Sequence, residues 1–161
     1  MKYERFEQLP VWRDAAKLAA ELFRFCSHPV FRGKGDLANQ LQRAALSISN
    51  NIAEGFERGT TKELINFLYY ARGSAGEVRS MLSVMTYLPD TKIVVSEIRK
   101  YQKSVEVIAR QIRGWTQSLQ DSPIKGQKYL TQESKEEYQG QKSRQAFLEQ
   151  LEEMAKQSRG F

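Results

Sequence analysis

The chain has 161 residues, of which 40% are hydrophobic, so it is long enough and apolar enough to fold around a core. Its single cysteine, Cys26, excludes an intramolecular disulfide and favours a reducing compartment. No apolar run approaches the roughly 20 residues that span a bilayer, and the first residues lack the apolar core of a signal peptide. We therefore expect a cytoplasmic protein that has no membrane partner.

The net charge of +6 is unevenly distributed along the chain. Residues 1–120 contain 18 Lys and Arg against 12 Asp and Glu, whereas residues 121–161 contain seven of each kind. The whole excess therefore belongs to the first part, where a basic surface would suit a phosphate backbone or another anion. An ordinary solvated surface is the alternative interpretation.

The first two helices are predicted over about residues 9–26 and from Asp36 to about residues 55–59. Their apolar residues recur every three or four positions, which is typical of one buried helix face. Asp36 is placed to cap the second helix, because its carboxylate can accept hydrogen bonds from free backbone N–H groups. The residues of the two stripes are Val11, Ala15, Leu18, Leu22 and Phe25, followed by Leu37, Leu41, Ala45, Ile48 and Ile52.

The third helix is predicted to begin at Thr60 and to end before Pro89. Thr60 and Glu63 have the spacing of a capping box, in which the hydroxyl accepts from the third helical N–H. Gly73 and Gly76 lie inside this helix, where each glycine costs about 1 kcal/mol relative to alanine. A close approach of another helix would explain why both are tolerated.

The fourth helix has the most regular apolar pattern in the chain, and Asp90 is placed to cap it. Its spacings alternate between four and three, as in a heptad seam. Four such helices with short connections predict an all-α, antiparallel up-down-up-down four-helix bundle over residues 1–120, without a sheet. The seam comprises Val94, Ile98, Tyr101, Val105, Ile108, Ile112, Trp115 and Leu119.

Residues 121–161 are expected to form a polar C-terminal extension: a linker, followed by a possible short helix. The segment is rich in Gln, Glu, Lys and Ser. Four apolar residues could line one face of the short helix, namely Phe147, Leu148, Leu151 and Met154. The segment is either loosely ordered or available to a partner surface.

The residues that usually carry catalysis are scarce in this sequence. Cys26 and the single histidine, His28, could form a nucleophile and its base, but no third group is in view to orient them. An inert thiol and a loop histidine are the alternative. No cluster suits a metal ion, so we expect neither a cofactor nor enzymatic activity.

A row of cations along the fourth helix is the candidate nucleic-acid-binding surface. Arg99, Lys103, Arg110 and Arg113 recur at helical spacing and flank the apolar seam. Such a row can follow a phosphate backbone, although a solvated helix face would have the same pattern. Three further cations could extend the basic surface: Arg32, Lys34 and Arg43.

Polar residues of the second and third helices are expected to form a structural network that the fold needs. Its members are Asn51, Glu54, Arg72 and Glu77. Several apolar residues lie partly off the main stripes and indicate self-assembly, since exposed apolar patches usually mark contacts. These residues are Phe56, Ile65, Tyr69 and Tyr70.

Five segments of the sequence resemble motifs of the bacterial four helix bundle proteins, also called the rRNA intervening-sequence protein family. They are residues 9–15 (LPVWRDA), 41–48 (LQRAALSI), 51–56 (NIAEGF), 58–63 (RGTTKE) and 71–77 (ARGSAGE). The resemblance covers about residues 3–120. It departs at Ser49, where many relatives have a proline, and it offers no counterpart for the C-terminal extension.

The resemblance implies a four-helix bundle that often assembles as a homopentamer. Members are encoded in intervening sequences of bacterial large-subunit rRNA genes. A related branch, the accessory proteins of diversity-generating retroelements, binds nucleic acid and a reverse transcriptase.

Two functions follow as expectations. The first is a non-enzymatic, homo-oligomeric accessory protein that binds RNA or other nucleic acid through its basic surface. The second is a protein–protein scaffold, whose partner, such as a reverse transcriptase, docks on the oligomer or on the C-terminal extension.

Overall fold

The computed structural model describes residues 3–122, 140, 143–150 and 154. The chain divides into two compact units, residues 1–128 and residues 129–161. In the second unit, residues 143–150 are helical, and Phe147, Leu148 and Met154 are exposed. The remaining member of the predicted apolar face, Leu151, lies outside the described residues.

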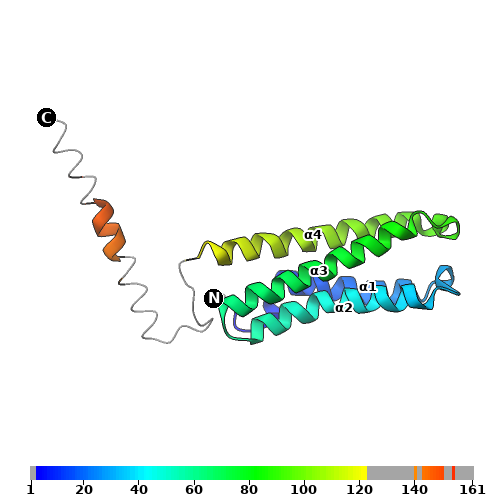
Figure 1. Cartoon of the computed structure of the whole chain (residues 1–161), viewed down its shortest axis with the longest axis horizontal. Coiled ribbons are helices and arrows are strands. Elements are labelled where there is room, and N and C mark those ends of the chain that lie inside the picture. The colour runs from blue at the N-terminus through cyan, green and yellow to red at the C-terminus, as the bar shows by residue number, and fades with distance from the viewer. Residues whose placement is uncertain (1–2, 123–139, 141–142, 151–153, 155–161) are drawn as a thin grey trace. The chain divides into compact units, whose positions relative to one another are not determined.

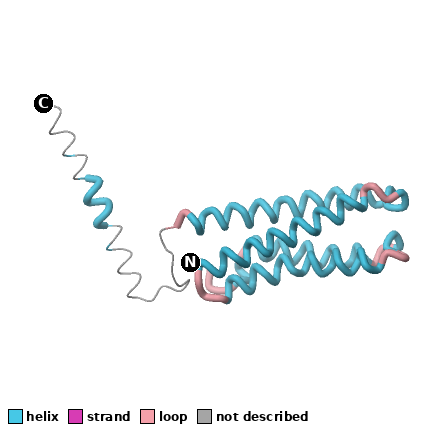
Figure 2. The backbone as a smooth tube through the Cα atoms, in the orientation of Figure 1, coloured by secondary structure: helices cyan, strands magenta, loops and turns pink. Residues whose placement is uncertain are grey.

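Four long helices make up the first unit: α1 (Pro10–Cys26), α2 (Gly35–Glu57), α3 (Thr61–Met85) and α4 (Val95–Gln120). Each helix packs against the next, and α4 returns to α1, so neighbouring helices run antiparallel (Figure 1). Short loops join them, and the described residues include no strand (Figure 2). The predicted all-α four-helix bundle is therefore confirmed.

The apolar stripes read from the sequence form the core of the bundle. Leu22 on α1, Ile48 on α2 and Leu68 on α3 are fully buried, as are Ile98 and Ile112 on α4. Trp115 and Leu119, at the end of the α4 seam, are partly buried against the same core. No helix of the described residues is long and apolar enough to cross a membrane.

Of the three predicted helix caps, the structure has the one at Thr60 and lacks those at Asp36 and Asp90. The backbone N–H of Glu63 donates to the Thr60 hydroxyl at 3.2 Å, so Thr60 caps α3 as expected. The prediction for Asp36 is wrong, because α2 begins at Gly35 and places Asp36 inside the first turn. In the first turn, its negative charge is still near the positive end of the helix dipole.

The prediction that Asp90 caps α4 is also wrong, because the N-cap residue of α4 is Val94. A 3-10 helix, η3 (Pro89–Val94), precedes α4, and Asp90 lies in its first turn. The Asp90 carboxylate pairs with Lys34, which lies next to η2 (Pro29–Phe31) in the α1–α2 connection. The hydrogen bond from Lys34 lowers the pKa of Asp90, and the pair joins two connections at one end of the bundle.

Within the described residues, the close helix approach predicted at Gly73 and Gly76 is not found there. A Cβ atom added at either position would meet nothing within 4 Å. The close approach occurs instead at Gly55 on α2, where an added Cβ would lie 2.6 Å from the Cβ of Phe67. The neighbouring Phe56, expected to lie partly outside the core, is fully buried.

Candidate nucleic-acid interface

A basic surface of the described residues follows the seam between α3 and α4. Two depressions lie along it, with volumes of about 510 and 430 Å³. Both include Arg79 of α3 and Glu106 of α4, so they adjoin and form one groove, here called the α3/α4 groove. Its charged residues are Arg72, Arg79, Arg99, Lys103, Glu106, Arg110 and Arg113.

The six cations of the α3/α4 groove are free to bind an anion from outside the chain. All six are exposed, and none takes part in the ion pairs found in the described part of the chain. Glu106 is likewise without an ion pair there, although it lies among them. Because the six cations outnumber the single carboxylate among them, the groove carries an excess of positive charge.

Small residues line one of the two depressions of the groove. Ala75, Gly76 and Ala109 lie between the cations, and the space above Gly76 is open. The long guanidinium side chains of this depression therefore stand beside residues with short side chains or none. A backbone of phosphates could approach the helices closely at this point.

The four cations predicted on α4 are brought together with two that the sequence prediction did not include. Arg99, Lys103, Arg110 and Arg113 all line the groove. Arg79 was missed, and Arg72 was predicted in a different role. The signal was present in the seven-residue separation of these two arginines, which places both on one helix face.

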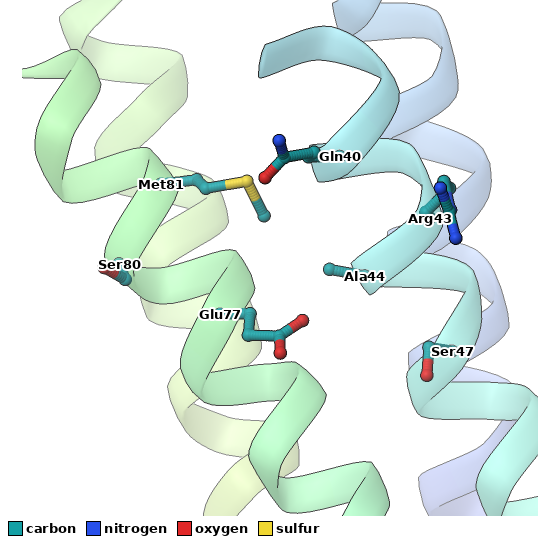
Figure 3. Close-up of a pocket in the computed structure, with 7 residues that line it drawn as sticks. All are labelled: Gln40, Arg43, Ala44, Ser47, Glu77, Ser80 and Met81. Carbon is teal, nitrogen blue, oxygen red and sulfur yellow. The ribbon is translucent and has the colours of Figure 1, made fainter. Parts of the chain in front are cut away.

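Arg43, also predicted to bind nucleic acid, lies apart from the α3/α4 groove. It lines a depression of about 520 Å³ between α2 and α3, together with Gln40, Ser47 and Glu77. Figure 3 shows the Glu77 carboxylate and Met81 reaching from α3 into the space that faces α2. With one cation and one carboxylate, this depression lacks the excess of positive charge found between α3 and α4.

Arg32 and Lys34 lie in the α1–α2 connection and line neither part of the groove. The ammonium group of Lys34 donates to the carbonyl oxygen of Val30 at 3.1 Å and also pairs with Asp90. Lys34 therefore has a partner already, whereas Arg32 is exposed.

Asn51, Glu54, Arg72 and Glu77 are not joined to one another by hydrogen bonds or ion pairs in the described structure. Asn51 donates to Ser47 within α2, and Glu54 pairs with Arg58 at 2.6 Å. The Arg72 guanidinium carbon lies 5.6 Å from the ring centroid of Tyr69. One polar link between α2 and α3 is instead a hydrogen bond of 2.9 Å between the hydroxyls of Ser47 and Ser74. A second is the ion pair at 3.7 Å between Arg58, the C-cap of α2, and Glu63 of α3.

Cys26 and His28 are held by different partners. The Cys26 thiol donates to the carbonyl oxygen of Ala38 at 3.7 Å, and burial raises its pKa to about 11. The Nδ1 atom of His28 accepts a hydrogen bond from the backbone N–H of Val30. Within the described residues, no group of three or more His, Cys, Asp or Glu is placed to hold a metal ion.

Comparison with known proteins adds one finding to this geometry. Residues 7–119 match the family model described as 23S rRNA-intervening sequence protein. The match spans the bundle up to the next-to-last residue of α4 and includes both helices that line the α3/α4 groove. No curated protein matches the chain.

Proposed function

Because the chain belongs to the 23S rRNA-intervening sequence protein family, we propose that it is a non-enzymatic accessory protein that binds RNA. The observation that carries this proposal is the α3/α4 groove, with six exposed cations and no ion pair to neutralise them among the described residues. The family description, which concerns rRNA, favours RNA over other polyanions.

Binding of this kind gains its free energy mainly from the release of counterions that surround the phosphates. If each of the six cations contacts a phosphate, the affinity falls by about 1,000-fold between 50 and 200 mM salt. An arginine or lysine that stays in solvent contributes nothing to this dependence. The slope of log affinity against log salt concentration therefore measures how many cations of the groove contact phosphates.

The test is a titration of labelled RNA with purified protein across a salt series. The variant Arg110→Glu/Arg113→Glu should bind at least tenfold more weakly at low salt and show a shallower slope. Lys17→Glu/Arg24→Glu is the matched control, since both residues are exposed on α1, which does not line the groove. Equal losses in the two variants would show that only total charge matters and would overturn the groove as the binding surface.

Self-association is part of the proposal, with the pentamer that the resemblance implies as the expected form. Exposed apolar side chains on the bundle support it, among them Tyr70, which is 60% exposed. Light scattering measures the mass directly, and a monomer at micromolar concentration would contradict this part. We also propose that the protein acts in the cytoplasm, in keeping with its lone, buried cysteine.

A protein–protein scaffold is the second candidate function, and the connection between α3 and α4 favours it. Tyr87 and Ile93 are 86% and 79% exposed, and Val84, in the last turn of α3, is 52% exposed. Exposed apolar side chains that lie close in the sequence commonly mark a protein contact. If a partner protein, such as a reverse transcriptase, docks on this connection, the variant Tyr87→Ser/Ile93→Ser should fail to bind it in a pull-down. If the partner docks on the C-terminal extension, a variant that lacks residues 121–161 should fail to bind it.

A further inference from the structure

The α3/α4 groove has its cations in two rows, one on each helix. The α4 row contains Arg99, Lys103, Arg110 and Arg113, and the α3 row contains Arg72 and Arg79. At 1.5 Å per residue, the α4 row is about 21 Å long and the α3 row about 10 Å. Packed helices have axes about 8–10 Å apart, so the two rows run side by side at roughly that separation.

Two parallel rows of cations fit a ligand with two phosphate strands better than a ligand with one strand. A single strand can follow only one row closely, which leaves the other row with little to bind. In double-stranded RNA, two strands border a wide and shallow minor groove, and both display phosphates to a flat protein surface.

The groove also lacks what a single-stranded ligand would require. Proteins that bind single strands stack the exposed bases on aromatic rings, which contribute about 1–3 kcal/mol per base. None of the residues that line the two depressions is aromatic. Tyr69, next to this surface, has a ring face already occupied by the guanidinium group of Arg72.

The side chains between the cations favour contact with the RNA backbone over contact with the bases. In the first depression, Ala75, Gly76 and Ala109 offer no hydrogen-bonding side chains that could distinguish one base from another. In the second depression, the Gln102 amide already donates to the Ser83 hydroxyl at 3.0 Å. Since the open space above Gly76 admits a close approach of the ligand, the lining favours contact with the sugar–phosphate backbone. We propose that the α3/α4 groove binds double-stranded RNA through both of its strands and independently of sequence; this inference rests on the proposed RNA-binding function.

The experiment compares two labelled RNA probes by fluorescence anisotropy at low salt. One is a 20-nucleotide strand without self-complementarity, and the other is the same strand annealed to its complement. The duplex should bind at least tenfold more tightly. Neutralising the α3 row in Arg72→Gln/Arg79→Gln should weaken duplex binding by about tenfold or more, because two phosphate contacts are lost.

The same variant should change single-strand affinity by less than about twofold, since a single strand needs only the α4 row. Lys17→Gln/Arg24→Gln removes two exposed cations with the same seven-residue separation from α1 and should leave both affinities unchanged. A thermal melt of each variant separates loss of binding from loss of fold.

Three results would overturn the inference. Equal affinity for the two probes, or an equal loss for both probes in Arg72→Gln/Arg79→Gln, would exclude recognition of two strands while leaving RNA binding in place. Failure of the wild-type protein to bind either probe would overturn the inference together with the proposed function.

Discussion

Gly55 shows how one missing side chain sets the distance between two helices. Its position on α2 faces Phe67 and Leu64 of α3 so closely that a Cβ atom would lie 2.6 Å from the Cβ of Phe67. That neighbour is the first carbon of the Phe67 side chain and cannot rotate away. The backbones would have to separate, and the contact between α2 and α3 would loosen.

We therefore expect Gly55→Ala to lower the free energy of unfolding by about 1–3 kcal/mol, despite the better helix propensity of alanine. Gly73→Ala is the matched control, because an added Cβ there meets nothing within 4 Å. That substitution should raise the free energy of unfolding by up to about 1 kcal/mol. Denaturant titrations measure both changes, and destabilisation by Gly73→Ala would point to a contact outside the described chain.

The buried environment of Cys26 gives a second testable prediction at this scale, which concerns the reactivity of its thiol. Because burial raises the pKa of its thiol to about 11, the reactive thiolate is scarce at pH 8. We expect an aromatic disulfide reagent to label Cys26 slowly in the native protein and rapidly in denaturant, with the native rate rising as the pH approaches 11. Rapid native labelling at pH 8 would contradict this account and reopen Cys26 as a nucleophile.

At the scale of the element, the start of α3 depends on one side chain. Thr60 accepts the hydrogen bond from the backbone N–H of Glu63 and thereby satisfies one of the free donors of the first turn. The adjoining Gly59 has a positive φ of 79°, so the connection from α2 to α3 turns tightly before the cap.

Thr60→Ala should therefore cost about 0.5–2 kcal/mol of stability, since the N–H of Glu63 loses its partner. Thr60→Ser keeps the hydroxyl and should cost much less, which separates the cap from other roles of the side chain. The comparison requires only thermal or denaturant melts of the two variants. Equal losses would show that the methyl group of Thr60, and not its hydrogen bond, stabilises this end of α3.

At the scale of the whole molecule, Glu106 is the one carboxylate among the six cations of the α3/α4 groove. It lies where the groove has its centre, since both depressions include it. A phosphate backbone that enters the groove is repelled by this carboxylate, so the wild-type groove binds RNA less tightly than its cations alone would.

We expect Glu106→Gln to raise the affinity for RNA by about two- to fivefold, because unit charges in water interact by roughly 1 kcal/mol at 4 Å and by less farther away. Glu57→Gln, an exposed position at the end of α2, is the control for net charge and should have little effect. Anisotropy titrations at fixed salt compare the two. A loss of affinity in Glu106→Gln would mean that this carboxylate orients the arginines instead of repelling the ligand.

The sequence by itself determined the four helices, because burial of an apolar face imposes a period of three to four residues on each of them. It also determined the cap at Thr60 and the cations of α4, since helical spacing fixes which residues share a face. Only the tertiary structure decided which faces meet. The pairing of Asp90 with Lys34, the close contact at Gly55 and the meeting of Arg72 and Arg79 with the α4 cations depend on helix rotation and separation, which packing across the core sets and no local pattern encodes.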